Sequence, residues 1–545
     1  NIETNLVDFQ IKAFKQIKES FLQKDVCLLH GVTSSGKTEL YIKLIEEQLE
    51  KGNQVLYLLP EIALTTQIIM RLRLHFGNKV GVTHSSLNNS ERVEIWKAVQ
   101  NTNENIYFPI MLGARSSLLL PYTNLGLIIV DEEHDSSFKQ HQPSPRYHAR
   151  DAAIYLGTLH NAKVLLGSAT PSAETYYNAK TKKYGLVEMH DRYSGISLPK
   201  LEIIDIRKAY LKKQMVHQFS PKMIDLISET LDDKKQVILF HNQRGYSRII
   251  SCKACSFTPS CNQCDVSLTY HKLHDHLRCH YCGYTEKLTE TCPSCSSVDF
   301  DDKGFGTQQI EESIKELFPV SSVKRMDYDT TRRKNAYQQI IDDFSNGKID
   351  ILIGTQMIAK GLDFDNVSLV GVLNADSMLK FPDFRAYERA FSLMMQVGGR
   401  AGRKKNQGKV LVQTYEESNE IFSLLKKHDY NTFISDQIKE RKLFKYPPYN
   451  RLILVTLKHK DRSQVNKFSQ LLSSRMRTIF GSRVLGPEFP FISRIRNYYH
   501  KNILLKIETE SSIVKAKELL SQLVENLRVL RDFRSVRVII DVDPI

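Results

Sequence analysis

A glycine-rich segment between a predicted strand and a predicted helix constrains this 545-residue chain more than any other feature. It reads Gly31-Val-Thr-Ser-Ser-Gly36-Lys37-Thr38 and fits the pattern G-x-x-x-x-G-K-[ST]. The two glycines let backbone N–H groups surround phosphate oxygens, and the start of the helix adds a favourable dipole. Lys37 would neutralise the β- and γ-phosphates of a nucleotide, and Thr38 would bind Mg²⁺. A fortuitous glycine-rich turn is the alternative, but the flanking strand and helix favour a P-loop.

An acidic run follows another predicted strand, at residues 126–130, and reads Asp131-Glu132-Glu133-His134. Asp131, at the carboxyl end of the strand, can hold Mg²⁺ together with the hydroxyl of the P-loop. Glu132 can orient or deprotonate an attacking water. A solvated acidic turn is the alternative. The P-loop and this run together predict a nucleoside triphosphatase and nothing more specific.

Two series of short apolar strands alternate with longer helical stretches. Strands that are buried on both faces and separated by helices are typical of parallel α/β sheets, so the two series predict two α/β lobes. The first series comprises residues 26–30, 54–59, 108–112, 126–130 and 163–167. The second comprises residues 236–240, 350–353, 368–373 and 409–413.

The net charge of +15 is concentrated near the C-terminus. Residues 441–545 hold 21 of the 76 basic residues but only 9 of the 61 acidic ones, and this excess predicts a polyanionic partner. The same region has its own pattern, which predicts a compact α+β domain. Its expected order is strand 451–457, helix 462–479, strand 502–507, helix 512–530 and strand 535–541.

Membrane insertion and secretion find no support in the sequence. The apolar runs are far shorter than the roughly twenty residues that a membrane helix needs. The N-terminal residues lack the basic and apolar regions of a signal peptide. We therefore expect no membrane association.

Eight of the nine cysteines form four Cys-x-x-Cys pairs within residues 252–295. Such clustering indicates metal binding in a reducing compartment rather than a disulfide framework. Two tetrahedral four-cysteine zinc sites would use every thiol and leave no position for a catalytic water, but the spacing does not fix the pairing. An iron–sulfur cluster or redox thiols are alternatives, and His271, His274, His276 and His280 are further possible ligands. The predicted zinc ligands are Cys252, Cys255, Cys261, Cys264, Cys279, Cys282, Cys292 and Cys295.

Further segments resemble the motifs of superfamily-two helicases, which bind ATP. The resemblance implies that Gln10 reads adenine and that Gly167-Ser-Ala-Thr170 couples nucleotide to DNA. Segment 354–363 resembles the fifth motif, with Gly361 and Asp363 at the nucleotide. Segment 396–403 resembles the sixth motif and supplies Gln396, Arg400 and Arg403.

Arginines on the second lobe would make hydrolysis depend on lobe closure. Hydrolysis needs positive charge on the γ-phosphate in the transition state. If Arg400 and Arg403 supply that charge, ATP binding is linked to closure and product release to opening. Surface charge or a phosphate contact is the alternative reading of this short Gly/Arg segment.

The chain as a whole resembles the PriA family of bacterial replication-restart helicases, also called primosomal protein N′. The segments that carry this resemblance are the four Cys pairs, the acidic run and residues 58–65, 113–118, 242–246 and 541–544. The resemblance implies two RecA-like lobes of an α/β fold, a Cys-rich zinc-binding insertion in the second lobe, and a small C-terminal α+β domain. The corresponding bounds are 1–195 for lobe 1, 196–250 and 297–430 for lobe 2, 251–296 for the insertion and 431–545 for the basic C-terminal domain.

The resemblance also implies an activity, cofactors and partners. The activity is ATP-dependent 3′→5′ DNA unwinding at stalled or abandoned forks, followed by primosome assembly for replication restart. The cofactors are ATP, Mg²⁺ and two structural Zn²⁺. The nested pairing joins Cys252, Cys255, Cys292 and Cys295 on one ion and the other four cysteines on the second. The partners are single-stranded and forked DNA, single-stranded DNA-binding protein and other primosome proteins, in the bacterial cytoplasm at the nucleoid.

The chain departs from the family pattern in three places. Only nine residues precede Gln10 and there is no initiator Met, so we expect a fragment that lacks the family's N-terminal DNA-binding region. Gln243 stands where the family often has Arg, and Gly398 where it often has Ala. The last two changes look tolerable, whereas the first puts binding of a 3′ end at a fork in doubt.

Two segments combine aromatic rings with cations, as single-stranded nucleic-acid sites do. The first follows the acidic run and predicts DNA contacts by Phe138, Lys139, Arg146, Tyr147 and Arg150, with a plain surface loop as the alternative. The second, residues 492–501, predicts contacts by Arg494 and Arg496, with solubilising charge or protein docking as alternatives. The family motif at residues 113–118 adds Arg115.

Two other functions remain open from the sequence. One is a DNA-binding primosome scaffold whose ATPase activity is incidental. The other is a different superfamily-two translocase, acting on RNA or duplex DNA. Retention of every ATPase element argues against the scaffold.

Overall fold

The computed structural model describes residues 5–545 apart from several short segments. These are residues 61–65, 86, 102–105, 194, 196, 242–248, 253–256, 264–265, 272–275, 280–281, 283, 288, 299, 304–305, 328–329, 332–335, 360–363, 382 and 403–406. The chain forms two compact units, residues 1–242 with 310–437, and residues 243–309 with 438–545. Every helix in the described ranges is too short or too polar to cross a lipid bilayer.

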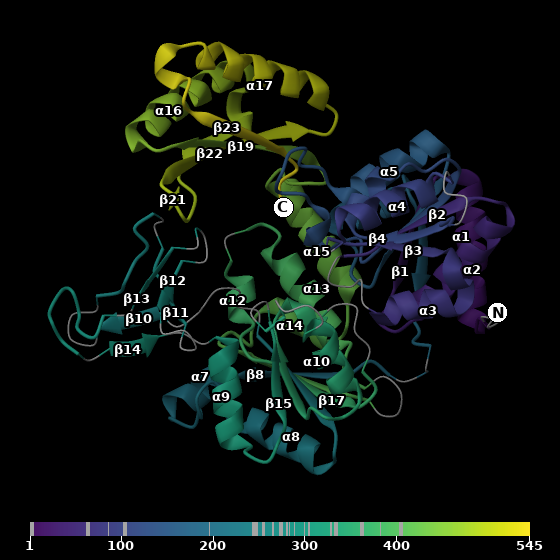
Figure 1. The fold of residues 1–545 in the computed structure, drawn as a ribbon, viewed down its shortest axis with the longest axis horizontal. Coiled ribbons are helices and arrows are strands. Elements are labelled where there is room, and N and C mark those ends of the chain that lie inside the picture. Colours follow the sequence, from purple (N-terminus) through teal and green to yellow (C-terminus); the bar gives the residue numbers. More distant parts are fainter. Residues whose placement is uncertain are drawn as a thin grey trace. The chain divides into compact units, whose positions relative to one another are not determined.

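The first unit begins with a seven-stranded parallel sheet, the first of two sheets in this unit, with strand order β3-β4-β2-β5-β6-β1-β7. Figure 1 labels strands β1 to β4 of this sheet. Its strands are β1 (Val26–Gly31), β2 (Gln54–Leu58), β3 (Val80–Thr83), β4 (Ile110–Gly113), β5 (Leu125–Asp131), β6 (Lys163–Ser168) and β7 (Gly185–Met189). The intervening helices are α1 (Asp8–Gln23), α2 (Lys37–Glu50), α3 (Thr66–Phe76), α4 (Asn89–Val99), α5 (Ala149–His160) and α6 (Ala173–Lys180).

Each face of this first sheet is buried in its own apolar core. Leu29 and Ile129 belong to one core, whereas their neighbours Leu28 and Ile128 belong to the other. This alternation follows from the two-residue period of a strand, and it explains why the predicted strands read as continuous apolar runs. All five predicted strands of the first series are confirmed, with ends shifted by up to two residues. The edge strands β3 and β7 were not predicted.

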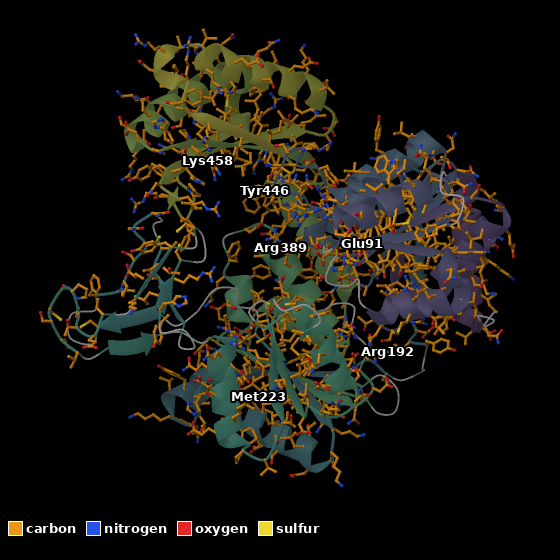
Figure 2. All side chains as sticks on the ribbon, in the orientation of Figure 1. Glu91, Arg192, Met223, Arg389, Tyr446 and Lys458 are labelled. Carbon is orange, nitrogen blue, oxygen red and sulfur yellow. The ribbon has the colours of Figure 1, made fainter. Side chains whose placement is uncertain are left out.

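The second sheet of the first unit has six parallel strands in the order β15-β16-β9-β17-β18-β8. These are β8 (Lys200–Asp205), β9 (Gln236–Phe240), β15 (Val323–Met326), β16 (Ile351–Gly354), β17 (Val367–Val372) and β18 (Lys409–Thr414). The helices are α7 (Ile206–Leu211), α8 (Pro221–Asp232), α9 (Thr307–Leu317), α10 (Ala336–Ser345), α11 (Gln356–Ala359), α12 (Asp376–Leu379), α13 (Ala386–Gly398), α14 (Glu420–Lys426) and α15 (Tyr430–Leu443). Met223 on α8, labelled in Figure 2, is fully buried in the same core as Leu239 and Ile353. The four predicted strands of the second series are confirmed.

The C-terminal part of the second unit is an antiparallel sheet whose core it shares with two helices, α16 (Arg462–Phe480) and α17 (Ile513–Arg528) (Figure 1). The strand order is β20-β22-β19-β23, and β21 pairs with β22. The strands are β19 (Asn450–His459), β20 (Val484–Glu488), β21 (Arg494–Ile495), β22 (Tyr498–Glu508) and β23 (Arg537–Val542). All predicted elements are present. The sequence missed β20 and β21, because β21 is two residues long and β20 contains Gly486 and Pro487, which mask a strand pattern.

The Cys-rich part of the second unit consists of short antiparallel strands. Strands β10 (Ile249–Cys252) and β14 (Phe300–Lys303) form a two-stranded ribbon at its ends. Between them, β11 (Thr269–His271), β12 (His276–Arg278) and β13 (Thr285–Lys287) form a three-stranded sheet. Its buried core consists of Cys261, Leu268, Leu277 and Cys279. A core of this size contributes little stabilisation by itself.

Candidate functional site

The P-loop connects β1 to α2 at the carboxyl end of the first sheet. Gly36 has φ +78°, and a Cβ atom there would lie 2.2 Å from Gln10 Nε2, so only glycine fits both the conformation and the space. Lys37, the first residue of α2, donates from Nζ to the Gly31 carbonyl oxygen at 2.9 Å. The Val32 N–H donates to the Met189 carbonyl oxygen at 3.1 Å and ties the loop to β7. These contacts fix the start of the loop to Lys37 on α2 and to β7.

Gln10 lies directly against the P-loop. Its side chain is fully buried, and Nε2 lies 3.3 Å from the Ser35 carbonyl oxygen and 3.2 Å from that of Gly36. Its Oε1 accepts from the Val7 N–H at 3.1 Å. The described contacts of Gln10 thus join the start of α1 to the phosphate loop, and recognition of adenine by Gln10 stays a prediction.

Asp131 ends β5, and each of its carboxylate oxygens accepts a hydrogen bond from a buried tyrosine. Tyr41 Oη lies 3.0 Å from Oδ1, and Tyr57 Oη lies 3.3 Å from Oδ2. Burial, and secondarily the charge of Glu132, raises the pKa of Asp131 from 3.8 to about 6, while Lys37 opposes this rise. A buried carboxylate beside a second acidic residue is an environment that a divalent cation relieves, so Asp131 fits Mg²⁺, and Thr38 as its partner stays a prediction. Neither tyrosine carries a local sequence signal, because one lies on α2 and the other on β2.

Glu132 belongs to a hydrogen-bond chain that joins the two lobes. Gln396 on α13 donates from Nε2 to Glu132 Oε2 at 3.0 Å and lies 2.8 Å from His134 Nε2. His134 Nδ1 lies 2.7 Å from Ser168 Oγ. If both Gln396 contacts are donated, His134 Nε2 is an acceptor and the imidazole carries its proton on Nδ1. These hydrogen bonds therefore connect the acidic run, the Ser-Ala-Thr segment and the sixth motif.

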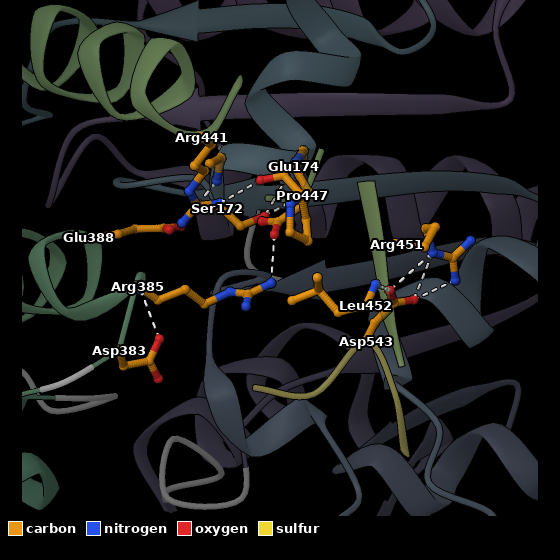
Figure 3. Close-up of polar contacts among 12 residues, drawn as sticks. Ser172, Glu174, Asp383, Arg385, Glu388, Arg441, Pro447, Arg451, Leu452 and Asp543 are labelled. Carbon is orange, nitrogen blue, oxygen red and sulfur yellow. Dashed lines mark hydrogen bonds and ion pairs between the residues drawn. The ribbon is translucent and has the colours of Figure 1, made fainter. Parts of the chain in front are cut away.

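A second group of contacts joins α13 and the residues before it to the start of α6. The Thr170 and Ser392 hydroxyls lie 2.6 Å apart, and Glu388 Oε1 accepts from the Ala173 N–H at 3.0 Å. Figure 3 shows the Arg385 guanidinium on Glu174, with Nη2 2.7 Å from Oε1. These contacts lie just beyond the Ser-Ala-Thr segment, so they link that segment to the second lobe independently of Gln396.

Arg400 follows α13 and is 8% exposed. Its Nε donates to the Ala359 carbonyl oxygen at 3.2 Å, which ties the sixth motif to the fifth within the second lobe. A Cβ atom on the neighbouring Gly399 would lie 2.8 Å from Thr33 Oγ1, so the backbone of the sixth motif lies close to the P-loop. The predicted site residues Gly361, Asp363 and Arg403 lie outside the described residues.

The predicted DNA-binding loop after the acidic run is held by its own side chains. Phe138 and Lys139 are each 1% exposed, and Lys139 Nζ donates to the Arg146 carbonyl oxygen at 3.0 Å. Arg115 Nη1 donates to the carbonyl oxygens of Ser137 at 2.9 Å and Lys139 at 2.7 Å. The prediction that Phe138 stacks on bases and Lys139 grips phosphates therefore needs correction, because both side chains are buried in the protein.

The remaining residues of that prediction differ in their surroundings. Arg150 Nη1 lies 3.1 Å from Glu133 Oε2 and 2.7 Å from Ser172 Oγ. Glu133 is fully buried, so Arg150 balances an internal charge, and the phosphate contact predicted for it is corrected to a structural ion pair. Arg146 and Tyr147 are partly exposed beside the exposed residues 141–145, and DNA contact by them stays a prediction.

The basic C-terminal cluster forms a hairpin on one of the cysteine groups. Arg496 and Asn497 have φ of +50° and +61° and form the turn between β21 and β22. The Asn497 N–H donates to the Gln263 carbonyl oxygen at 2.8 Å, and Ile495 packs against the core that contains Cys261 and Cys279. Arg494 and Arg496 are therefore positioned by the Cys-rich part of the same unit.

Cations also lie over aromatic rings elsewhere in the C-terminal domain. Lys506 Nζ is 3.6 Å from the ring centroid of Tyr446, which Figure 2 labels together with Lys458. The Arg537 guanidinium lies 4.8 Å from the Tyr498 centroid.

At the chain end, Arg451 Nε pairs with both carboxylate oxygens of Asp543, at 3.0 and 2.9 Å (Figure 3), and holds the terminal Asp541–Pro544 segment on β19.

The described cysteines of the Cys-rich part form two groups of three, with all thiol sulfurs of a group within 4.8 Å of one another. Cys252 groups with Cys292 and Cys295, and Cys261 groups with Cys279 and Cys282. The Sγ atoms of Cys252 and Cys295 lie 3.5 Å apart, as do those of Cys261 and Cys282, whereas a disulfide needs about 2.05 Å. Cys255 and Cys264, the fourth members in the nested pairing, lie outside the described residues.

Backbone N–H groups point at sulfurs in both groups. The N–H groups of Gln263, Tyr284 and Ser294 each donate to the sulfur two residues earlier, at 3.4 Å. Clustered cysteine sulfurs are the ligands that tetrahedral structural zinc sites use. The two groups therefore fit zinc better than they fit disulfides.

Comparison with protein families agrees with this architecture. Residues 8–179 match the model for the DEAD/DEAH box helicase, and residues 298–405 match the helicase conserved C-terminal domain. Residues 261–287 match the PriA DNA helicase Cys-rich region domain, and residues 442–545 match the primosomal protein N C-terminal domain. The fold is thus two RecA-like lobes with an ATP-binding P-loop, a Cys-rich zinc-binding insertion and a C-terminal α+β domain.

Curated relatives named replication restart protein PriA match nearly the whole chain. That of Bacillus subtilis (strain 168) is 40% identical over 99% of this chain, and that of Synechocystis is 40% identical over 95%. The chain spans 66% and 62% of their respective lengths. The relative from Chlamydia trachomatis is 39% identical over 98% of this chain and 71% of its own length. With its family-specific Cys-rich and C-terminal domains, the chain belongs to the PriA family of replication restart proteins.

Proposed function

We propose that this chain is an ATP-dependent 3′→5′ DNA helicase that unwinds stalled or abandoned forks and initiates primosome assembly. The main observation in favour of an ATP-driven motor is the hydrogen bond that Gln396, on the second lobe, donates to Glu132 on the first. Because Glu132 is the candidate for orienting the attacking water, any change in lobe position alters the group that hydrolysis depends on. Family membership supports the substrate, the polarity and the role in restart.

The proposed nucleotide site combines residues of both lobes. Lys37 and the backbone of Gly31 to Gly36 bind the phosphates, and Thr38 with Asp131 holds Mg²⁺, which neutralises charge on the β- and γ-phosphates when bound. Glu132 orients the water, and Gln396 holds Glu132. Gln10 is proposed at the adenine, and Gly361, Asp363, Arg400 and Arg403 at the nucleotide from the second lobe. Arg400 would have to exchange its Ala359 contact for a phosphate when the lobes close.

The functions proposed for the domains follow the domain bounds that the sequence predicts. Residues 1–195 with 196–250 and 297–430 form the motor, residues 251–296 form the zinc insertion, and residues 431–545 form the basic domain. Two Zn²⁺ are proposed, one on each cysteine group with Cys255 or Cys264 as its fourth ligand. Their contribution would be to fold a region whose own core is small.

DNA contact is proposed for the partly exposed cations Arg115, Arg146 and Arg494, for the exposed Arg496, and for Tyr147. Single-stranded DNA-binding protein and other primosome proteins are the proposed protein partners, and the bacterial nucleoid the proposed location. These proposals rest on family membership and on the +15 net charge.

Unwinding of forked DNA tests the motor. Lys37→Ala should lower ATP hydrolysis by ~100-fold or more and abolish unwinding, because the phosphates lose their main cation. Lys43→Ala on the same helix, where Lys43 pairs with Glu46, is the matched control and should leave both activities unchanged. If Lys37→Ala unwinds DNA as well as the parent chain does, ATP turnover is incidental. That result would favour the alternative function, a DNA-binding primosome scaffold.

The polymer that stimulates hydrolysis tests the substrate. Single-stranded DNA should stimulate ATP hydrolysis more than RNA or blunt duplex DNA does. Stronger stimulation by RNA would favour an RNA helicase, and stronger stimulation by duplex would favour a double-strand translocase.

Elemental analysis should give two zinc ions per chain, and one or none would exclude the two-site arrangement.

A further inference from the structure

The Asp131 carboxylate is held by two tyrosine hydroxyls that belong to no motif. We propose that Tyr41 and Tyr57 are positioning residues that fix the orientation of Asp131 for Mg²⁺·ATP. This inference rests on the proposed ATP hydrolysis. It adds two residues to a site that the P-loop and the acidic run otherwise define.

The two hydroxyls approach Asp131 from different elements. Tyr41 lies on α2, one turn after Thr38, and Tyr57 lies on β2, which pairs with β5. Each hydroxyl contacts a different carboxylate oxygen, at 3.0 and 3.3 Å. The Glu132 N–H also donates to Oδ1, at 3.1 Å, so the two hydroxyls and this backbone group together hold both oxygens of the carboxylate in place.

The rings themselves cannot move aside. Tyr41 and Tyr57 are both fully buried, and their ring centroids lie 5.5 Å apart in an edge-to-face arrangement at 78°. Such packing locks both side chains in one rotamer. The position of Asp131 is therefore coupled to α2, whose first residues form the P-loop.

Gly167 makes room for the Tyr41 hydroxyl. This glycine pairs with Asp131 across β5 and β6 and opens the Ser-Ala-Thr segment. A Cβ atom on Gly167 would lie 1.8 Å from Tyr41 Oη and 3.2 Å from Asp131 Oδ1. Any larger residue would displace the hydroxyl from the carboxylate, so the hydrogen bond from Tyr41 to Asp131 requires glycine at position 167.

The simpler reading is that the two rings only fill the apolar core to which they belong. Removal of the hydroxyl alone separates the two readings.

Tyr41→Phe, Tyr57→Phe and the double variant keep the rings and remove the donors. Each single change should raise the Mg²⁺ concentration for half-maximal ATP hydrolysis by roughly tenfold, as loss of a hydrogen bond to a charged group does. Binding of a fluorescent ATP analogue, measured with and without Mg²⁺, should weaken only when Mg²⁺ is present. Melting temperatures check that the variants fold.

Tyr122→Phe is the matched control. Tyr122 is also buried in the first lobe, but its hydroxyl donates to the Ser117 carbonyl oxygen at 2.9 Å, in the other core. It should leave the Mg²⁺ dependence unchanged. The proposal is overturned if the Tyr41 and Tyr57 variants match Tyr122→Phe, or if they weaken analogue binding equally without Mg²⁺. If the parent chain hydrolyses no ATP, the proposed function fails, and analogue binding still decides the role of the tyrosines.

Discussion

The nucleotide lobe and the Cys-rich part build their candidate cation sites in opposite ways. Asp131, Tyr41 and Tyr57 come from three different elements, and a sheet with an apolar core on each face brings them together. The six described thiols of the Cys-rich part lie within residues 252–295, and only Cys261 and Cys279 among them belong to its buried core of four residues. In the first region folding creates the site, whereas in the second the proposed zinc would complete the folding.

Cysteine chemistry sharpens this contrast. Burial within β1 raises the pKa of the Cys27 thiol to about 12, so Cys27 stays protonated as an apolar core residue. In the Cys-rich part, backbone N–H groups donate to Cys261, Cys282 and Cys292. The same residue type is thus a packing group in one region and a candidate zinc ligand in the other.

Loss of one thiolate should have the largest effect. Cys279→Ser should remove one zinc ion per chain and unfold the Cys-rich part, because structural zinc supplies ~10–16 kcal/mol of apparent binding free energy. Elemental analysis and protease digestion measure the two consequences. Cys27→Ala is the control and should retain both ions. Retention of two ions by Cys279→Ser would break the comparison.

A core substitution in the nucleotide lobe should have the second-largest effect. Leu112 on β4 is fully buried, and Leu112→Ala should lower the free energy of unfolding by ~2–5 kcal/mol. Zinc content should not change, since this core contains no metal ligand among the described residues. Leu159→Ala, at a position 62% exposed, is the matched control for thermal or chemical unfolding. Loss of zinc from Leu112→Ala would show that the two regions fold as one.

Crowding of the Asp131 site should be smaller but measurable. Gly167→Ala puts a methyl group against the Tyr41 hydroxyl, which should cost ~1–3 kcal/mol of stability through overpacking. The same melting experiments detect it, and a Tyr41→Phe background should recover part of the loss. An unchanged melting temperature would contradict the close approach of Tyr41 to β6.

The smallest effect is expected at Gly398. A Cβ atom there would lie 3.4 Å from Val410 Cγ2, an ordinary contact, at the end of α13. Gly398→Ala should therefore stabilise the chain by up to ~1 kcal/mol, because alanine has less freedom to lose on folding. A lower melting temperature would show that the sixth motif needs glycine here for a reason other than space.

Sequence patterns predicted the regular parts of the fold well and the edges poorly. The central strands β1, β2, β5 and β9 read as apolar runs because both faces are buried. The edge strands β3 and β7 are partly exposed, which weakens that pattern. Local composition also failed for Phe138 and Lys139, since a loop rich in aromatics and cations looks the same whether it faces DNA or its own protein.

By itself, the sequence determined the chemistry whose partners are neighbours along the chain: the P-loop, the acidic run and the four Cys pairs. It also located the basic excess, because charge can be counted without coordinates. Only the tertiary structure decided which thiols group together, that Gln10 and Gly399 lie against the P-loop, and that two tyrosines hold Asp131. The physical reason is that these contacts join residues far apart in sequence, and only packing of the sheets and helices sets their distances.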